Sequence, residues 1–96
     1  MKIRSFSHKG LKRLYAEDDA RAVPPDAIDK LRKMLAFLEG TQAAEELRPL
    51  ATWKAHLLTR DRKWTRSLSV TGNRRLTFRV DSVESEVWGL DLEDYH

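Results

Sequence analysis

The sequence contains no cysteine, which excludes disulfide bonds, thiolate catalysis and thiolate metal ligands. It has no apolar run near the length of about 18 residues that a transmembrane helix requires. The first ten residues lack the apolar stretch of a secretory signal peptide. The three histidines do not have the spacing of a metal site, and no motif calls for a cofactor. We therefore expect a cytoplasmic protein with no membrane association, no metal and no cofactor.

The composition predicts a small globular protein. The chain has 96 residues, of which 41% are hydrophobic and 34% are charged. This length fits one hydrophobic core, so we expect a single domain over residues 1–96.

Positive charge is concentrated between Trp53 and Arg79. This segment holds eight basic residues and one acid, Asp61, whereas the whole chain has a net charge of only +3, so the remainder is net acidic. A basic surface on an otherwise acidic domain is typical of a protein that binds a polyanion. A solvated, arginine-rich hairpin without a ligand is an equally ordinary interpretation.

Two amphipathic helices are predicted in the first half of the chain. Ser7 is suited to cap a helix over residues 8–16. Two consecutive prolines begin a longer helix that ends near Gly40, and its apolar residues recur at helical spacing: Ile28, Leu31, Leu35 and Leu38. The pattern also allows a short helix over residues 41–47.

The second half of the chain alternates with period two, as strands do. Apolar residues recur at every second position in four stretches, and in the last of them Trp88, Leu90 and Leu92 are expected to face the core. Gly72-Asn73 suits a tight turn between the second and third stretches. We predict an α+β fold, with N-terminal helices packed on one face of an antiparallel sheet and a short N-terminal strand.

The opposite phase of these strands is polar. Seven residues are expected on this open face: Lys54, His56, Ser67, Ser69, Arg75, Thr77 and Arg79. The segment Glu93-Asp94-Tyr95-His96 follows the last strand directly, so it can reach the same face. Taken alone, a strand histidine of this kind is more often solvated than catalytic.

Several of these residues form a pattern that resembles a known toxin family. The pattern comprises residues 3–12, 56–63, 67 and 73–78, the prolines before the long helix, and the final Glu-Asp-Tyr-His. It is similar to the HigB branch of the RelE/ParE toxin superfamily over nearly the whole chain. Members are toxins of type II toxin–antitoxin pairs that bind the ribosomal A site and cut messenger RNA there. The resemblance implies the same fold and activity for this chain.

The resemblance also implies site residues and partners. The family's catalytic cluster corresponds by position to four residues: His56, Asp94, Tyr95 and His96. Arg75 matches the arginine of the family's Asn-Trp-Arg motif. Other basic residues expected to bind RNA phosphates are Lys54, Arg62, Lys63 and Arg79. The implied partners are the ribosome, messenger RNA and a helix-turn-helix antitoxin of the HigA type, whose complex with the toxin can occupy operator DNA.

These residue types suit metal-independent RNA cleavage, in which the ribose 2′-oxygen attacks the adjacent phosphate. The reaction needs a base for the 2′-hydroxyl, an acid for the leaving 5′-oxygen and positive charge beside the phosphorane. His56 and His96 can divide the roles of base and acid in either order, and Arg75 can hold phosphate oxygens. Asp94 is expected to orient a histidine, and Tyr95 to stack on a base or hold the proton-transfer geometry.

Four positions depart from the family pattern. Arg60 and Trp64 stand where glycine is usual, and Arg66 and Arg74 stand where tryptophan is usual. The last two are in phase with the apolar residues of their strands, so we expect both arginines to point toward the core. Two other functions remain open. One is a ParE-like toxin that inhibits DNA gyrase without cutting RNA, and the other is an inactive antitoxin-binding relic, which the departures favour.

Overall fold

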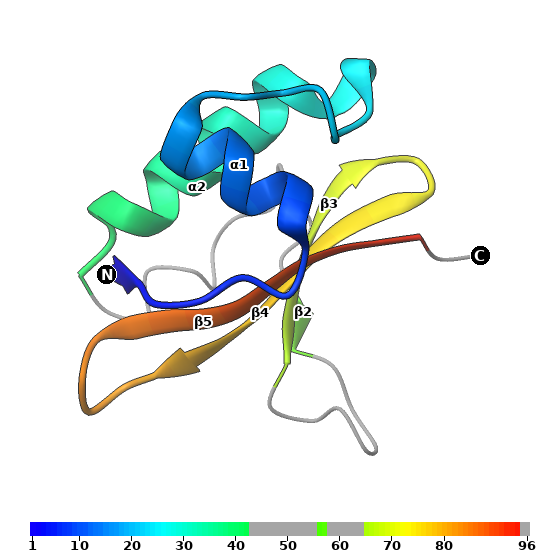
Figure 1. Ribbon diagram of the computed structural model, residues 1–96. Helices are drawn as coiled ribbons and strands as arrows, with labels where there is room; N and C mark the ends of the chain where they lie inside the picture. The colour runs from blue at the N-terminus through cyan, green and yellow to red at the C-terminus, as the bar shows by residue number, and fades with distance from the viewer. Residues whose placement is uncertain (43–55, 58–64, 95–96) are drawn as a thin grey trace.

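The computed structural model describes residues 1–42, 56–57 and 65–94. Its elements, in chain order, are β1 (Lys2–Ile3), α1 (Lys9–Glu17), the 3-10 helix η1 (Pro25–Ala27), α2 (Ile28–Gly40), β2 (His56–Leu57), β3 (Arg66–Thr71), β4 (Arg74–Asp81) and β5 (Glu86–Asp94). Both helices lie on one side of the sheet (Figure 1). Most of the short helix expected over residues 41–47 falls outside the described residues.

The five strands form one sheet in the order β1-β5-β4-β3-β2. Strands β2 to β5 make the predicted antiparallel meander, and the turn at Gly72-Asn73 joins β3 to β4 because Thr71 pairs with Arg74. Strand β1 lies parallel to β5 at the edge of the sheet. The predicted α+β fold is therefore confirmed, with a parallel edge strand in place of a purely antiparallel sheet.

Helix α1 begins one residue later than expected. His8 is its N-cap, and the Nδ1 atom of that histidine accepts a hydrogen bond from the Leu11 N–H at 3.1 Å. The prediction that Ser7 caps this helix was wrong, because the imidazole supplies the acceptor that a cap requires. Gly10 is needed in the first turn, since a Cβ there would lie 2.6 Å from the Ala22 carbonyl oxygen.

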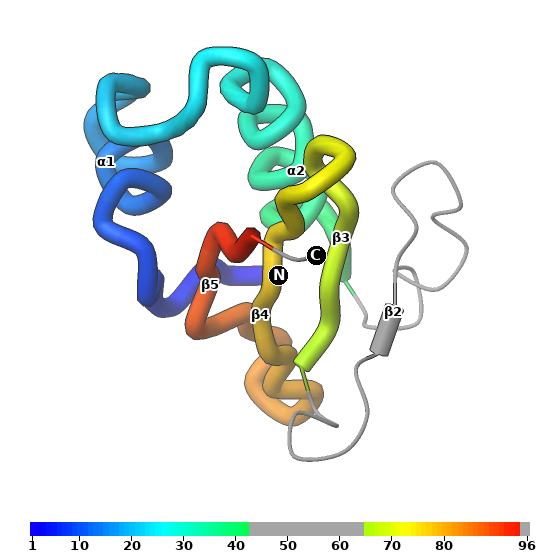
Figure 2. The backbone as a smooth tube through the Cα atoms, turned by 90° about the vertical axis from the view of Figure 1, so that its right-hand side faces the viewer, coloured from blue at the N-terminus to red at the C-terminus, as the bar shows by residue number. Residues whose placement is uncertain are grey.

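The hydrophobic core lies between the helices and the sheet. Helix α2 was predicted almost to its ends, and Leu31, Met34 and Leu38 on its inner face are fully buried. The sheet contributes Leu68, Val70, Leu76, Phe78, Val87 and Leu90. Figure 2 shows the two helices beside each other over the strands. In the part of the chain that the structure describes, no helix has the length and apolar character needed to cross a membrane.

A bulge in β5 reverses the predicted phase at Trp88. Thr77 pairs with Asp91 and Arg79 pairs with Trp88, so the single residue Phe78 of β4 lies opposite two residues of β5, Gly89 and Leu90. Gly89 has a φ of +67° at this point, a conformation that glycine adopts readily. The extra residue leaves Val87 and Leu90 in the core but turns Trp88 to the polar face. The expectation that Trp88 shares the core face with Leu90 was therefore wrong.

Candidate functional site

A single row of residues crosses the sheet from β2 to β5. His56 pairs with Ser67, Ser67 with Thr77, and Thr77 with Asp91. Neighbouring strands lie about 4.8 Å apart, which puts the backbone of His56 about 14 Å from that of Asp91. His56, the candidate base or acid, is therefore at one end of the row. Asp91 of β5, the strand that leads into the C-terminal tail, is at the other end.

The neighbouring row contains Arg75, the basic residue expected to hold phosphate. Arg75 pairs with Ser69 on one side and with Glu93 on the other. Its Nη2 lies 4.0 Å from Glu93 Oε1, and the Thr77 hydroxyl donates to Glu93 Oε2 at 2.5 Å. Glu93 therefore contacts a residue of each row, Arg75 and Thr77, and holds the Arg75 guanidinium near the end of β5.

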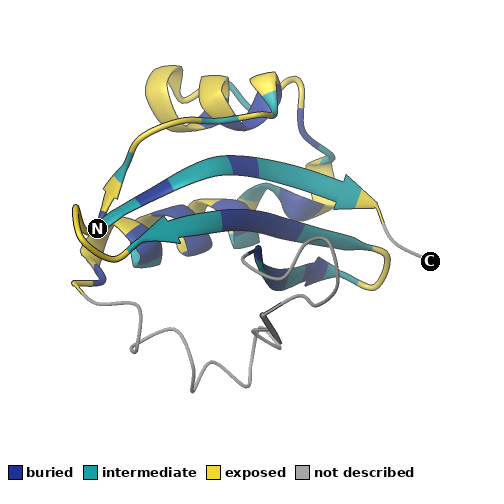
Figure 3. Cartoon of the chain, turned by 90° about the horizontal axis from the view of Figure 1, so that it is seen from below, coloured by how far each residue is buried: buried dark blue, intermediate teal, exposed yellow. Residues whose placement is uncertain are grey.

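The polar face is less open than its alternation suggests. Ser67 and Thr77 were expected on an open face, yet they are 4% and 2% exposed. Thr77 lies between Arg75 and Arg79 on its own strand and donates to Glu93, so larger polar side chains surround it. Figure 3 shows that buried and half-buried positions run along these strands. On this face the side chains of Arg75 and Arg79 are thus more exposed than Ser67 and Thr77.

The structure separates Asp94 from Arg75. Asp94 pairs in register with Arg74, whereas Arg75 pairs with Glu93, so the two candidate site residues lie on opposite faces at the end of the sheet. Asp94 points to the helix side, where its Oδ1 is 3.3 Å from Arg74 Nε. The expectation that the whole tail reaches the polar face was thus wrong for Asp94.

Arg74 turns toward solvent instead of entering the core. Its side chain is 29% exposed and also approaches Asp26 of η1, with 4.0 Å between Arg74 Nη1 and Asp26 Oδ1. The predicted phase is right, because Arg74 shares the helix side of β4 with Leu76 and Phe78. Since it is the first residue of the strand, its long side chain reaches two carboxylates at the rim, which a mid-strand arginine could not do.

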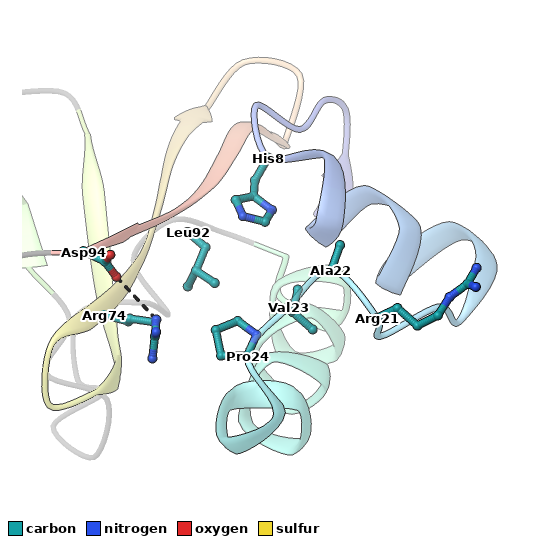
Figure 4. A pocket seen from close by; sticks show the side chains of 8 residues that line it. All are labelled: His8, Arg21, Ala22, Val23, Pro24, Arg74, Leu92 and Asp94. Carbon is teal, nitrogen blue, oxygen red and sulfur yellow. Dashed lines mark ion pairs between the residues drawn. The ribbon is translucent and has the colours of Figure 1, made fainter.

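A cavity of about 390 Å³ lies beside this ion pair, on the helix side of the sheet. Four of its lining residues are apolar: Ala22, Val23, Pro24 and Leu92. Figure 4 shows His8 pointing into the space from one side, with the Arg74–Asp94 pair at the other. Arg21 lies at the edge of the cavity, and its side chain extends away from it (Figure 4).

Arg66, the other arginine expected in the core, lies in register with Phe78 of β4 and is half-buried. Arg66 therefore lies on the helix side of the sheet, as expected from its phase. Because it is partly exposed, it does not enter the core completely.

An aromatic–arginine stack on the polar face was missed by the sequence reasoning. The Cζ atoms of Arg4 and Arg79 lie 5.2 Å and 5.3 Å from the centre of the Trp88 ring. Arg4 follows β1 and Arg79 belongs to β4, so the two arginines approach the ring from the two neighbours of β5. Gly89, directly after Trp88, is the local sequence signal for the bulge that creates this arrangement.

Other predicted site residues fall outside the described part of the chain. They are Lys54, Arg62, Lys63, Tyr95 and His96, together with the departing positions Arg60 and Trp64. Their assignment stays a prediction. For His56 the structure gives the strand and its register alone. No group of three potential metal ligands occurs among residues 1–42, 56–57 and 65–94.

Comparison with known proteins identifies the family. A family model described as the RelE-like toxin of the type II toxin–antitoxin system HigB matches residues 4–96. The chain belongs to the HigB-like toxin family. Endoribonuclease HigB from Proteus vulgaris is 34% identical over 95 residues, which are 98% of this chain and 99% of that protein. The resemblance stated from the sequence is thereby confirmed, and this HigB-like chain is a toxin of a type II toxin–antitoxin system.

Solved structures support the fold of this HigB-like chain. The toxin–antitoxin complex RelBE2 from Mycobacterium tuberculosis contains a chain with 23% identity and a TM-score of 0.54, covering 99% of this chain and 96% of that one. A YoeB/ParE toxin from Agrobacterium tumefaciens has 18% identity and a TM-score of 0.61, with 100% and 99% covered. At these identities the likeness concerns the fold alone.

Proposed function

We propose that the chain is a ribosome-dependent messenger RNA endonuclease that cuts by attack of the ribose 2′-oxygen on the adjacent phosphate. The observation that carries this proposal is the 34% identity, over 98% of the chain, to a protein named as an endoribonuclease. The gyrase-inhibiting alternative is not favoured, because that relative is a nuclease. A ribosomal target would also place the toxin in the cytoplasm.

The polar face supplies groups that suit this reaction. His56 begins the row that leads to Asp91, and Arg75 lies one row closer to the tail. In the proposed mechanism one histidine removes the 2′-hydroxyl proton, and the other protonates the 5′-oxygen as its bond to phosphorus breaks. Arg75 donates to the phosphate oxygens as negative charge develops on them.

The tail supplies the remaining groups of the proposed site. Asp94 lies on the helix side in an ion pair with Arg74, so its role is to fix where the chain leaves the sheet and thereby to orient His96. In the same scheme Tyr95 stacks on a base of the bound RNA or holds the proton-transfer geometry. In this scheme the Arg74–Asp94 pair is a support for the tail rather than part of the proton transfer.

Membership in a type II toxin–antitoxin family gives this chain an antitoxin partner. We propose more specifically that the antitoxin is a helix-turn-helix protein of the HigA type, and that the complex binds operator DNA. A basic toxin surface would be complementary to an acidic or amphipathic segment of such a partner.

The proposed function is tested by adding the purified toxin to a cell-free translation reaction and mapping the ends of the messenger RNA. We expect cuts within translated codons. The His56→Ala variant should lose cleavage by on the order of 10²–10⁴-fold, because a general acid or base of the reaction is removed. Ribosome binding should remain, since it is spread over many basic residues.

His8→Asn is the matched control, because asparagine is a good helix N-cap and the variant removes a histidine that lies outside the proposed site. Its cleavage rate should match the parent. If the messenger RNA stays intact with the parent toxin, the proposed activity is wrong. If His56→Ala cleaves as fast as the parent, the activity stands and only the assignment of His56 is wrong.

A further inference from the structure

The bulge in β5 gives the polar face a feature that the proposed mechanism does not use. Trp88 is half-buried and carries a guanidinium from each neighbouring strand segment, Arg4 and Arg79, on its ring system. Arg4 is itself anchored by Glu86 at 3.2 Å and Asp81 at 3.7 Å. The stack is therefore held by ion pairs of Arg4 on the β1 side, while Arg79 approaches the ring from β4.

A second cavity, of about 210 Å³, opens directly beside this stack. Trp88 and Arg79 contribute planar groups to its wall, and Asp91 and Glu93 contribute carboxylates. Hydroxyl groups complete the polar lining: Ser7, Thr65 and Thr77. The cavity is smaller than the 300–1,000 Å³ or so of sites for drug-sized ligands, and it suits a single flat ring.

The residues that line the cavity indicate which chemical class of ligand it can bind. Indole and guanidinium planes are the surfaces on which unpaired bases stack, and each such stack contributes useful affinity. Carboxylates accept hydrogen bonds from exocyclic amines, as they do from cytosine N4 in base recognition. Asp91 Oδ1 already accepts from the Leu92 N–H at 3.0 Å, which holds this carboxylate in place. Two carboxylates disfavour a phosphate inside the cavity and favour a base that carries an amino group.

The cavity lies within reach of the strand that the proposed site would cut. Arg79 lies four positions after Arg75 on β4, which is about 13 Å at the usual rise per residue. A groove that binds single-stranded nucleic acid covers several nucleotides, so one bound strand can extend from Arg75 to Trp88.

We infer that the cavity beside Trp88 is a subsite for one unpaired base of single-stranded RNA, selective for bases with an exocyclic amine. The base stacks on the Arg79 guanidinium, which itself lies over the Trp88 ring, and its amino group donates to Asp91. The inference rests on the proposed function, because it assumes that the polar face receives RNA, and it adds a specificity site distant from the bond that is cut.

The test measures binding of short 2′-O-methyl oligoribonucleotides, which cannot be cleaved through a 2′-hydroxyl, by fluorescence anisotropy at low salt. All-adenine and all-cytosine oligonucleotides should bind more tightly than all-uracil. Trp88→Leu should weaken all-adenine binding at least about fivefold, while Trp88→Phe retains most of the affinity because it keeps an aromatic plane. Asp91→Asn should bring the ratio of adenine to uracil affinity close to one, because an amide can also donate to uracil O4.

Tyr15→Leu is the matched control for loss of an aromatic residue, since Tyr15 is 41% exposed on α1, on the other side of the sheet. It should bind all oligonucleotides as the parent does. The inference is wrong if Trp88→Leu binds all-adenine RNA as tightly as the parent does. It is also wrong if Trp88→Leu binds the antitoxin more weakly while its RNA binding is unchanged. Cleavage in the translation assay together with either result would leave the proposed function standing, so the two failures are distinguishable.

Discussion

The two faces of the sheet differ in how their residues are used. On the helix side, Leu76, Phe78 and Leu90 are at most 1% exposed and belong to the hydrophobic core. On the other side, Arg75, Arg79 and Trp88 are half-buried and interact through charge and ring contacts. The difference suggests that stability and ligand binding are carried by separate sets of residues on the same strands. Substitutions one position apart should therefore have effects of different kinds.

The largest effect on stability is expected on the helix side. Phe78→Ala should lower the free energy of unfolding by about 3–5 kcal/mol, because it removes a ring that is 1% exposed and leaves a cavity. In a domain of this size that corresponds to a fall in melting temperature of more than about 10 °C. Phe78→Leu, which keeps most of the volume, should cost much less. A melting temperature of Phe78→Ala within a few degrees of the parent would show that this face does not carry the stability.

A smaller effect is expected where the two faces meet at the end of the sheet. Arg74→Leu removes ion pairs to Asp94 and Asp26, whose carboxylates are 65% and 68% exposed, and adds an apolar group beside Leu92. Pairs as exposed as these contribute about 0–1 kcal/mol each, so unfolding in urea should change by no more than about 1 kcal/mol. If the free energy of unfolding rises by well over 1 kcal/mol in Arg74→Leu, then Arg74 destabilises the fold. Its place in the strand, in phase with apolar residues, would by itself predict that result.

On the polar face the expected change concerns binding more than folding. Arg79→Ala removes its contact with Trp88, so stability should fall by only about 0.5–1 kcal/mol. The slope of log affinity for RNA against log salt should decrease by about one if Arg79 contacts one phosphate. Arg21→Ala is the matched control, because Arg21 is 91% exposed and lies on the loop before η1. An unchanged slope in Arg79→Ala would separate the basic face from RNA binding.

The smallest effect is expected away from both faces, in the loop after α1. A side-chain hydrogen bond from Arg21 lowers the pKa of Asp19 from 3.8 to about 2. The stabilisation from this pair is therefore complete above pH 3.8 and is lost as the pH falls through 2. Between pH 4 and pH 2 the parent should lose slightly more thermal stability than Asp19→Asn. A carboxyl titration of Asp19 by NMR with its midpoint near 3.8 in the parent would contradict this account.

Much of the fold follows from local pattern. Helix α2 was predictable because Leu31, Leu35 and Leu38 repeat at helical spacing over 13 residues. The hairpin at Gly72-Asn73 was predictable because its turn residues are distinctive. The position of β1 was not, since two residues carry no pairing information and its partner is distant in sequence. Trp88 was misplaced because period two holds only while the register is unbroken, and the β5 bulge breaks it.

The candidate site was less accessible to sequence reasoning than the fold. The resemblance, not the residue types, singled out His56 and Asp94 among ordinary polar positions. It could not show that Asp94 lies on the helix side with Arg74, because that depends on where β5 ends relative to β4. The stack of Arg4, Trp88 and Arg79 joins three segments and one bulge, so no single stretch of sequence predicts it.

The pairing of β1 with β5 also bears on the order of events during synthesis. The Ser5 hydroxyl accepts from the Gly89 N–H across 84 residues, and Lys2 pairs with Glu86. Among the described strands, β1 thus pairs only with β5, more than 80 residues later in the chain, and contacts of such long range form slowly. Until β5 has left the ribosomal exit tunnel, a nascent chain has neither this sheet edge nor the Trp88 stack.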